Sequence, residues 1–250
     1  IQVPNKGSEW PLSKKFGCSP DMAEKLLFEA RRMGLKPLGV SFHVGSQQKS
    51  ITSWQQAIKI VAKVYKNLFD QGMRMNFLNI GGGFPTNYSK YNTDIRKYSK
   101  KILLSIDKKF GINKPKNIIS EPGRFLVADA GIIEAEIILE SKKCSGKSRS
   151  WVYIDVGRYN GLAETEGEAI KYLIKVAHND KKIRKKNFIL AGPSCDSHDI
   201  IYEKTACYLP HNIQVGDKIR ILSAGAYTTV YNTNFNGLPA VEEYYLDWFI

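Results

Sequence analysis

Three short apolar segments in the first half of the chain each run into residues that can bind a ligand. The three motifs are Ser-Phe-His-Val-Gly-Ser at residues 41–46, Asn-Ile-Gly-Gly-Gly-Phe at 79–84 and Glu-Pro-Gly-Arg at 121–124. His43 precedes Gly81 by 38 residues, and Gly83 precedes Glu121 by the same number. This spacing predicts one kind of structural unit that is repeated along the chain and presents its chemistry at the same rim each time.

Apolar stripes at helical spacing separate the three segments. Ser19 followed by Pro20 is typical of a helix start, with serine as the cap, and Gly34 suits the end of the same helix. Two further stripes predict helices over 54–68 and 95–106, and strands are predicted at 38–44, 77–80 and 117–120. Helices that alternate with short apolar strands indicate a parallel sheet.

The pattern changes after residue 129. Strands are predicted at 131–139, 151–156, 188–191 and 218–222, and the polar segment 141–150 fits a hairpin connection. A helix is predicted over 166–176. We therefore predict two domains, an α/β part over residues 1–129 and a mostly β domain over 130–250.

The length of the α/β part limits the fold that it can form. A closed (β/α)8 barrel takes about 250 residues, whereas this part has 129. The sequence is therefore compatible with a small open α/β sheet or with the second half of a barrel. The first residue is Ile rather than Met, which favours the truncated barrel.

Composition indicates a globular protein and narrows the classes of partner. The chain has 250 residues, of which 43% are hydrophobic and 24% charged, as in ordinary globular proteins. No apolar run approaches the ~18–20 residues that a membrane span needs. The net charge of +13 is compatible with a nucleic-acid surface, but the Lys-rich clusters carry no interleaved aromatic residues. We expect neither a membrane nor a nucleic acid as partner.

The cysteines indicate neither a zinc site nor a disulfide framework. Cys18, Cys144, Cys195 and Cys207 form no Cys-x-x-Cys pair. No signal peptide is visible. We therefore expect a reducing compartment, the cytoplasm, and no metal site.

The rim of a parallel sheet is where ligands of α/β folds bind, and the three motifs are predicted to lie there. Consecutive glycines let backbone N–H groups approach a phosphate, and Arg124 can pair with the same phosphate. Each feature alone has a structural explanation, such as a tight turn, a surface ion pair or a buried histidine. Together they fit pyridoxal phosphate, with its ring against His43 and its protonated nitrogen on Glu121.

With these motifs the chain resembles the fold-type III pyridoxal-phosphate decarboxylases, the ornithine/diaminopimelate/arginine decarboxylase group. Three later segments resemble the family's substrate loop, late cofactor segment and C-terminal substrate motif: Gly-Pro-Ser-Cys-Asp-Ser at 192–197, Gly-Ala-Tyr-Thr-Thr at 225–229 and Phe-Asn-Gly-Leu-Pro at 235–239. The resemblance implies the C-terminal portion of an alanine-racemase-like, TIM-like (β/α)8 barrel, followed by a β-rich domain.

The resemblance also implies the residues that hold the cofactor. His43 would stack on the cofactor ring and take part in catalysis, Ser46 would hydrogen-bond the cofactor, and Glu121 would hold the pyridinium nitrogen. The residues implied for the phosphate are Gly81, Gly82, Gly83, Gly123, Arg124 and Tyr227.

On the substrate side, the resemblance implies that Cys195 gives a proton to the substrate carbon after carbon dioxide has left. Asp196 would pair with the distal ammonium group, and Phe235 and Asn236 would line the same site. In the family the residues that match Cys195 and Asp196 act in the partner's site. The resemblance therefore implies a homodimer with shared active sites.

The Cys-Asp-Ser and Phe-Asn-Gly-x-Pro segments are most similar to ornithine decarboxylase, and Gly-Leu-Ala-Glu-Thr at 161–165 resembles its bacterial branch. The implied reaction converts L-ornithine to putrescine, a step of polyamine biosynthesis. Lysine stays open as the substrate, because one methylene group discriminates by only ~1–3 kcal/mol in a pocket. Diaminopimelate decarboxylation and a non-catalytic homologue that regulates a true decarboxylase also stay open.

The sequence departs from the family at one position. The family's Schiff-base lysine lies on an early strand in an Ala-Val-Lys context, and no lysine of this chain has that context. Lys36 stands before Pro37, at the wrong end of its predicted strand. We therefore expect the first strands of the barrel to be missing and the 250 residues alone to be poorly active or inactive.

Overall fold

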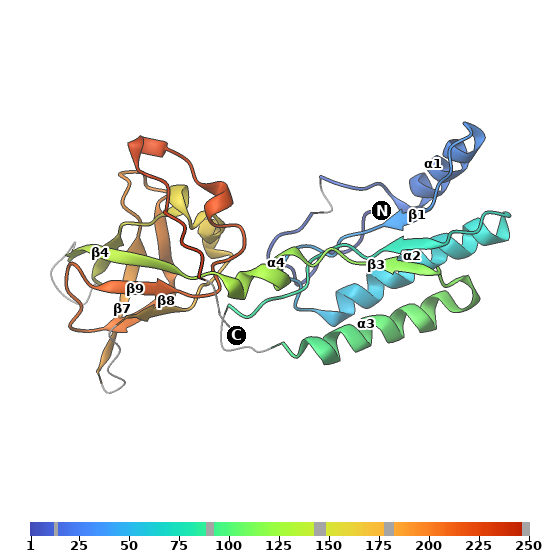
Figure 1. Cartoon of the computed structure of the whole chain (residues 1–250). Coiled ribbons are helices and arrows are strands. Elements are labelled where there is room, and N and C mark those ends of the chain that lie inside the picture. Colours follow the sequence, from blue (N-terminus) through green and yellow to red (C-terminus); the bar gives the residue numbers. More distant parts are fainter. Residues whose placement is uncertain (13–14, 89–92, 143–148, 178–182, 247–250) are drawn as a thin grey trace. The chain divides into compact units, whose positions relative to one another are not determined.

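Figure 1 shows the computed structural model of the chain, which describes all residues except 13–14, 89–92, 143–148, 178–182 and 247–250. The chain divides into unit 1 (Ile1–Asn87 and Tyr91–Leu126) and unit 2 (Tyr88–Lys90 and Val127–Ile250). Each unit has a hydrophobic core of its own. The two units are therefore described separately.

Unit 1 is built around three parallel strands. Strands β1 (Gly39–Ser41), β2 (Phe77–Asn79) and β3 (Asn117–Ile119) pair in that order. The register sets Val40 opposite Leu78, and Leu78 opposite Ile118. The first two motifs overlap the last residue of β1 and of β2, and the third begins two residues after the end of β3. The prediction of a parallel sheet in which strands alternate with helices is confirmed.

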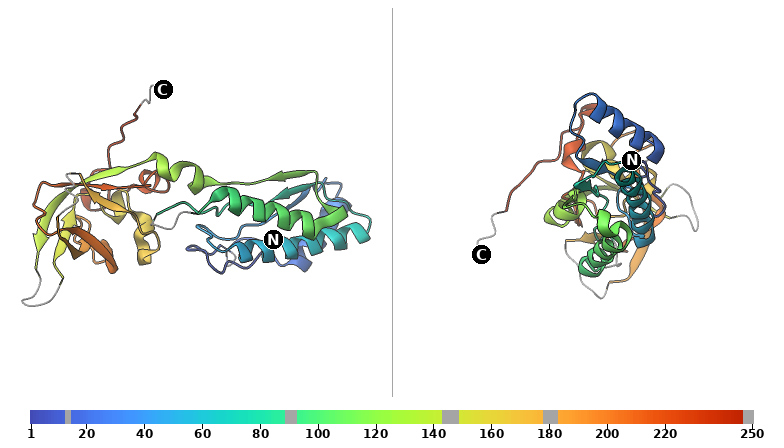
Figure 2. Two further views of the ribbon diagram at one scale, coloured as in Figure 1. Left: turned by 90° about the horizontal axis from the view of Figure 1, so that it is seen from below. Right: turned by 90° about the vertical axis from the view of Figure 1, so that its right-hand side faces the viewer.

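Helices α2 (Ile51–Asp70) and α3 (Ile95–Phe110) run side by side in the views of Figures 1 and 2. The predicted apolar stripe of α2 is buried at every position: Trp54, Ala57, Ile58, Val61, Val64, Tyr65 and Leu68. The stripe predicted for α3 is buried or half-buried except at Leu103, which is 55% exposed. Burial of these stripes supplies half of the core of unit 1.

Local capping explains where the helices of unit 1 begin and end. Helix α1 (Pro20–Arg32) begins as predicted, because Ser19 Oγ accepts the N–H of Met22 at 3.3 Å. It ends just before Gly34, whose φ of 80° only glycine adopts readily. A short helix that the sequence does not signal, α4 (Gly123–Val127), follows the third motif. Among the described residues, none of the helices could cross a membrane.

Unit 2 contains a six-stranded sheet of order β6-β9-β4-β5-β7-β8. Its strands are β4 (Ile133–Ser141), β5 (Trp151–Ile154), β6 (Ile174–Val176), β7 (Lys185–Ala191), β8 (Ile200–Pro210) and β9 (Lys218–Ile221). Strands β4 and β5 pair antiparallel, as predicted for a hairpin, whereas β5 and β7 pair parallel. Cys18, Cys195 and Cys207 are free thiols, and Cys144 lies outside the described residues.

The prediction of a helix over residues 166–176 is wrong. The segment contains the end of a 3-10 helix, η4 (Ala163–Glu168), and the strand β6, which pairs with β9. Gly167 and Glu168 have φ values of 58° and 57°, which a right-handed helix cannot contain. Beyond them, residues 170, 172, 174 and 176 are buried or half-buried, and the residues between them are exposed. That period of two belongs to an extended chain.

Strand β8 was not expected from the sequence, and the side chain of Glu168 explains part of its position. The Glu168 carboxylate accepts the backbone N–H groups of Glu203, Lys204 and Thr205 at 2.8, 2.6 and 2.6 Å. Burial tends to raise the pKa of Glu168, but these hydrogen bonds outweigh burial and lower the pKa to about 2. One carboxylate therefore joins the end of η4 to the middle of β8.

We expect the substitution Glu168→Gln to lower the free energy of unfolding by about 1–2 kcal/mol at pH 7, because the side chain is only partly buried and solvent screening reduces the effect. A carboxyl group with a folded pKa below its unfolded value stabilises above pH 4.5, and that stability is lost as the pH falls toward 2. Urea unfolding between pH 7 and pH 3 should show the difference shrinking below pH 4.5. Glu203→Gln, an exposed side chain, is the control. A loss that does not vary with pH would contradict this account.

Candidate active site

The carboxyl ends of β1, β2 and β3 bring the three motifs together at one edge of the sheet of unit 1. The backbone hydrogen bonds between the strands continue past the strand ends. Phe42 N–H donates to Asn79 O at 3.1 Å, and Ile80 N–H donates to Ile119 O at 3.0 Å. Beyond it, Glu121 N–H donates to Gly81 O at 2.9 Å. His43, the glycine triplet and Glu121 thus lie in adjacent loops, where the sequence predicts them.

The three glycines at 81–83 lie where the neighbouring loops pass too close for a side chain. A Cβ atom on Gly81 would stand 2.1 Å from Phe42 O, one on Gly82 2.5 Å from Glu121 O, and one on Gly83 2.3 Å from Gly45 O. Backbone atoms are the obstacle in each case. Gly81 N–H already donates to Asn79 Oδ1 at 2.8 Å. An anion bound here would therefore meet the N–H groups that follow Gly81.

Glu121 presents an exposed carboxylate at this edge. Its Oε1 accepts a hydrogen bond from Asn79 Nδ2 at 3.1 Å. Because Asn79 also accepts from Gly81, one amide side chain orients the carboxylate and the start of the glycine loop. Sequence reasoning assigned no role to Asn79, although the residue stands in the second motif directly before the glycines.

The ring of His43 is held at a fixed angle beside the glycines. Gly45 N–H donates to His43 Nδ1 at 2.9 Å, so the proton of the neutral ring is carried by Nε2. A Cβ atom on Gly82 would stand 3.0 Å from that Nε2. Burial lowers the pKa of His43, and the nearby Glu121 carboxylate opposes this shift in part. The imidazole is therefore neutral at pH 7.

Arg124 and Ser46, two residues predicted to bind one ligand, lie together. The guanidinium of Arg124 is buried, and its Nη2 donates to Ser46 Oγ at 3.3 Å. The backbone of Ser46 is fixed in turn, because its N–H donates to Trp10 O at 2.9 Å. Gly123 is exposed, and its N–H donates to Glu121 O at 3.0 Å.

Two consecutive glutamines that sequence reasoning missed fix the first motif to the second. Gln47 is buried and exchanges two hydrogen bonds with the backbone of Thr86, at 2.6 and 3.0 Å. Gln48 is also buried, and its backbone N–H donates to Gly83 O at 2.8 Å. A signal for this role exists in the sequence, because two consecutive amides beside an apolar segment need buried hydrogen-bond partners.

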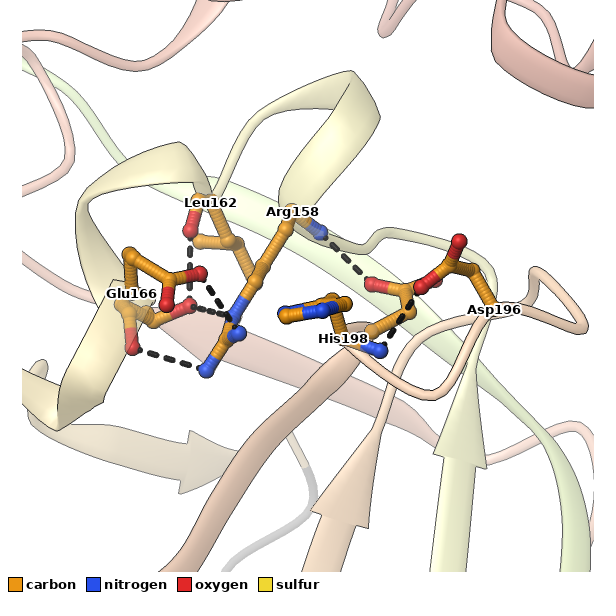
Figure 3. A network of polar contacts seen from close by, with 7 residues as sticks. Arg158, Leu162, Glu166, Asp196 and His198 are labelled. Carbon is orange, nitrogen blue, oxygen red and sulfur yellow. Dashed lines mark hydrogen bonds and ion pairs between the residues drawn. The ribbon is translucent and has the colours of Figure 1, made fainter.

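In unit 2, Cys195 and Asp196 lie on the turn between β7 and β8, and Figure 3 shows this turn. The thiol of Cys195 is exposed. Asp196 Oδ1 accepts the N–H of His198 at 2.7 Å, and its carbonyl accepts the N–H of Asp199 at 3.0 Å. The two predicted substrate-side residues are thus held on a turn with internal hydrogen bonds.

Tyr159 connects Asp196 to the third predicted substrate-side residue. Tyr159 belongs to the 3-10 helix η3 (Arg158–Asn160), and its ring stacks on Phe235 with centroids 4.2 Å apart. Burial, together with the charge of Asp196 and a hydrogen bond to it, raises the pKa of Tyr159. Unit 2 therefore brings Asp196 and Phe235 together around an aromatic side chain that sequence reasoning missed.

The remaining predicted site residues of unit 2 lie in irregular segments. Asn236, in the 3-10 helix η6 (Phe235–Gly237), is exposed and has a φ of 55°. Tyr227 has a φ of 56° and is 39% exposed, and its ring stacks on Tyr231 at 6.1 Å. A positive φ at a residue other than glycine costs about 1–3 kcal/mol and is frequent at ligand sites.

Comparison with known proteins identifies relatives for nearly the whole chain. The family model described as "Pyridoxal-dependent decarboxylase, pyridoxal binding domain" matches residues 3–128. A lysine/ornithine decarboxylase of Selenomonas ruminantium is 31% identical over 95% of this chain and 58% of its own length. An ornithine decarboxylase of Schizosaccharomyces pombe is 30% identical over 99% of this chain and 56% of its own length.

A solved structure shows the same arrangement of elements. The lysine/ornithine decarboxylase of Vibrio vulnificus, complexed with cadaverine, superposes with a TM-score of 0.78 at 29% identity. The match covers 91% of this chain and 60% of that one. The chain thus spans little more than half the length of the relatives that it matches.

Proposed function

Since this chain belongs to the fold-type III pyridoxal-phosphate-dependent decarboxylases, we propose that the protein decarboxylates a basic amino acid, with L-ornithine as the substrate and putrescine as the product. One observation carries the proposal. Glu121, His43 and the glycine triplet meet at one edge of the sheet, within the residues that the pyridoxal-binding family model matches. The Cys-Asp-Ser and Phe-Asn-Gly-x-Pro segments support ornithine among the basic amino acids.

The edge of the sheet in unit 1 fits pyridoxal phosphate. Positions 81–83 leave no room for a Cβ atom, so backbone alone can line this part of the site. The donor set suits both ends of the cofactor, with a guanidinium and glycine N–H groups for an ester phosphate and a carboxylate for a ring nitrogen. When bound, the cofactor supplies an electron sink for the electron pair of the broken Cα–carboxyl bond.

Glu121 and His43 would orient the cofactor ring. The Glu121 carboxylate, held by Asn79, would accept a hydrogen bond from the protonated ring nitrogen and so keep that nitrogen charged. His43 would lie flat against the ring, because Gly45 fixes its Nδ1. A neutral imidazole suits this position, since a second cation beside the charged ring would repel it.

Arg124, Ser46 and the glycine loop would bind the phosphate ester. Arg124 is buried beside Ser46, so its charge acts in a medium of low dielectric constant. Gly123 and Tyr227 are proposed for the same group, and Gly81 would contribute through its conformation because its N–H is already bonded.

Cys195, Asp196, Phe235 and Asn236 would act on the substrate. Asp196 would bind the distal ammonium group, and Cys195 would give its thiol proton to the substrate α-carbon after carbon dioxide leaves. The stacked pair of Tyr159 and Phe235 would exclude water from the substrate's methylene chain. We propose that these residues serve the site of a second subunit in a homodimer in the cytoplasm.

The test is product analysis with the protein isolated from its source organism. Incubation with ¹⁴C-carboxyl-labelled L-ornithine, L-lysine and meso-diaminopimelate should release labelled carbon dioxide fastest from ornithine, with putrescine as the amine. A faster release from lysine would correct the substrate and leave the reaction class intact. Bound cofactor without release from any substrate would refute the enzyme and favour a non-catalytic homologue.

We further expect the 250 residues alone to bind the cofactor without a covalent bond and to release no carbon dioxide. Residues 42–48, 80–88 and 120–126, which form the edge loops, contain no lysine that could bond the cofactor aldehyde. Treatment with borohydride and mass spectrometry should therefore find no cofactor attached to the chain. Turnover of ornithine at ordinary enzyme rates, about 1 s⁻¹ or more, would contradict this expectation.

A further inference from the structure

Asp199 is a buried carboxylate to which the sequence motifs assign no role. It stands directly before β8 and is 2% exposed. Its Oδ1 accepts the backbone N–H of Arg158 at 2.8 Å. Its Oδ2 accepts both the N–H and the hydroxyl of Ser194, at 3.1 and 2.7 Å. Three donors thus converge on one side chain, which offsets the cost of burying its charge.

Two glycines make the slot that this carboxylate fills. A Cβ atom on Gly157 or on Gly192 would stand 2.4 Å from Asp199 Oδ1. Gly157 is the third residue after the end of β5, and Gly192 directly follows β7. Because β5, β7 and β8 are neighbours in the sheet, the carboxylate lies where the ends of three adjacent strands meet.

The same residue closes the turn that carries Cys195 and Asp196. Gly192 N–H donates to Asp199 O at 2.8 Å, and Asp199 N–H donates to Asp196 O at 3.0 Å. Cys195 and Asp196 stand between Ser194 and Asp199, so the side-chain bonds to Ser194 span both of them. The turn is therefore tied to Asp199 at its beginning, at its middle and at its end.

Asp199 also links this turn to the aromatic pair on the substrate side. The Arg158 N–H that it accepts belongs to the residue before Tyr159, whose ring stacks on Phe235. The guanidinium of Arg158 is held separately, by Glu166 at 2.8 Å and by the carbonyl of Thr165 at 3.0 Å (Figure 3). One carboxylate thus fixes the distance between η3 and the Cys195–Asp196 turn.

We propose that Asp199 is the positioning residue that sets Cys195 and Asp196 relative to each other and to Tyr159, an inference that rests on the proposed function. Asp199 reaches neither substrate nor cofactor in this role; it acts through the backbone of Ser194 and Arg158. Both the proton donor and the ammonium-binding carboxylate depend on it, so its loss should change kcat and KM together.

The test compares Asp199→Asn with Asp217→Asn. Both are aspartates directly before a strand, and Asp217 Oδ2 likewise accepts a backbone N–H, from Gln214 at 2.8 Å, but Asp217 is only half-buried. Asparagine at position 199 has the shape of aspartate, but its amide NH2 replaces one carboxylate oxygen. That NH2 group would face one of the three donors and could not accept its hydrogen bond. Ser194→Ala, which removes the hydroxyl donor alone, is the milder variant if the asparagine variant fails to fold.

The first measurement is hydrogen exchange in the 250-residue chain, which needs neither cofactor nor activity. Exchange at the amides of Arg158 and Ser194 should accelerate about tenfold in Asp199→Asn and less in Ser194→Ala. The amide of Cys207, which donates to Asn187 Oδ1 at 3.0 Å, should be unchanged. Alkylation of the Cys195 thiol by iodoacetamide should change in rate in parallel, and Asp217→Asn should match the unmodified chain.

The second measurement is steady-state kinetics in the form of the protein that shows decarboxylation. Asp199→Asn should lower kcat/KM about 10- to 100-fold, divided between a lower kcat and a higher KM, because small displacements of reacting groups are costly. Unchanged exchange and alkylation would overturn the inference whatever the activity. Loosened exchange in the 250-residue chain, combined with no release of carbon dioxide by the protein isolated from its source organism, would instead refute the proposed function and leave the role of Asp199 in the turn standing.

Discussion

Alanine in place of Gly81 should destabilise unit 1 by about 3 kcal/mol or more and abolish cofactor binding, because two costs add. The φ of 69° is unfavourable for any residue with a Cβ atom, and that atom would stand 2.1 Å from Phe42 O. A backbone oxygen in the first turn after β1 cannot move aside without breaking the ladder. Urea unfolding, followed by fluorescence and combined with a titration of pyridoxal phosphate, measures both effects.

Gly72→Ala is the matched control for this substitution. Gly72 has a φ of 79°, close to that of Gly81, but no atom lies within 4 Å of the position of its Cβ. The free energy of unfolding of Gly72→Ala should therefore fall only by the conformational cost, about 1–2 kcal/mol. This variant should bind the cofactor as the unmodified chain does. If both substitutions lowered the free energy of unfolding equally, the close contact between Gly81 and Phe42 O would contribute nothing to stability.

The second large effect is expected at Glu121. Glu121→Gln should lower kcat about 100- to 1000-fold, since a neutral amide does not keep the cofactor nitrogen protonated in the reacting state. Cofactor binding should weaken less, about 10-fold, which corresponds to one hydrogen bond to a charged group. Steady-state kinetics with ornithine and a binding titration separate the two effects.

Glu134→Gln is the control for Glu121→Gln. Glu134 is an exposed acid that pairs with Arg220 at 3.0 Å in unit 2, and its loss should leave kcat within about twofold. Asn79→Ala should give an intermediate loss, because it removes the hydrogen bond that orients the Glu121 carboxylate. If Glu121→Gln kept full activity, the Glu121 carboxylate would not be needed for catalysis, and the proposed mechanism would be wrong on this point.

The sequence predicts unit 1 well because its signals are local. The stripe of α2 and the cap at Ser19 depend on residues a few positions apart, and both are seen in the structure. The three motifs are found together because parallel strands fix where their carboxyl ends lie. What the sequence does not convey is which partner each polar group takes. The roles of Asn79 and Gln47 depend on contacts with residues 42 and 39 positions away.

Unit 2 is predicted less well because its signals are not local. After Glu168, buried and exposed residues alternate with a period of two. The acidic residues Glu164 and Glu166 directly before this segment resemble the first turn of a helix, and they obscure the alternation. Strand β8 is interrupted by bulges opposite β7, and its burial pattern has no regular alternation. Asp199 looks like a turn residue in the sequence, and only the folded chain shows that Gly157, 42 positions earlier, provides its slot.

The order of the sheet in unit 1 has a consequence for how copies of this chain associate. In the described part of the chain, β1 and β3 each pair with β2 alone among the strands. On β1, the carbonyl of Ser41 already accepts the amine of Ile1 at 2.7 Å, whereas β3 pairs with no described strand on its outer side. An open strand side is a template for pairing with another chain, so β3 favours association between molecules at high concentration unless another segment covers it.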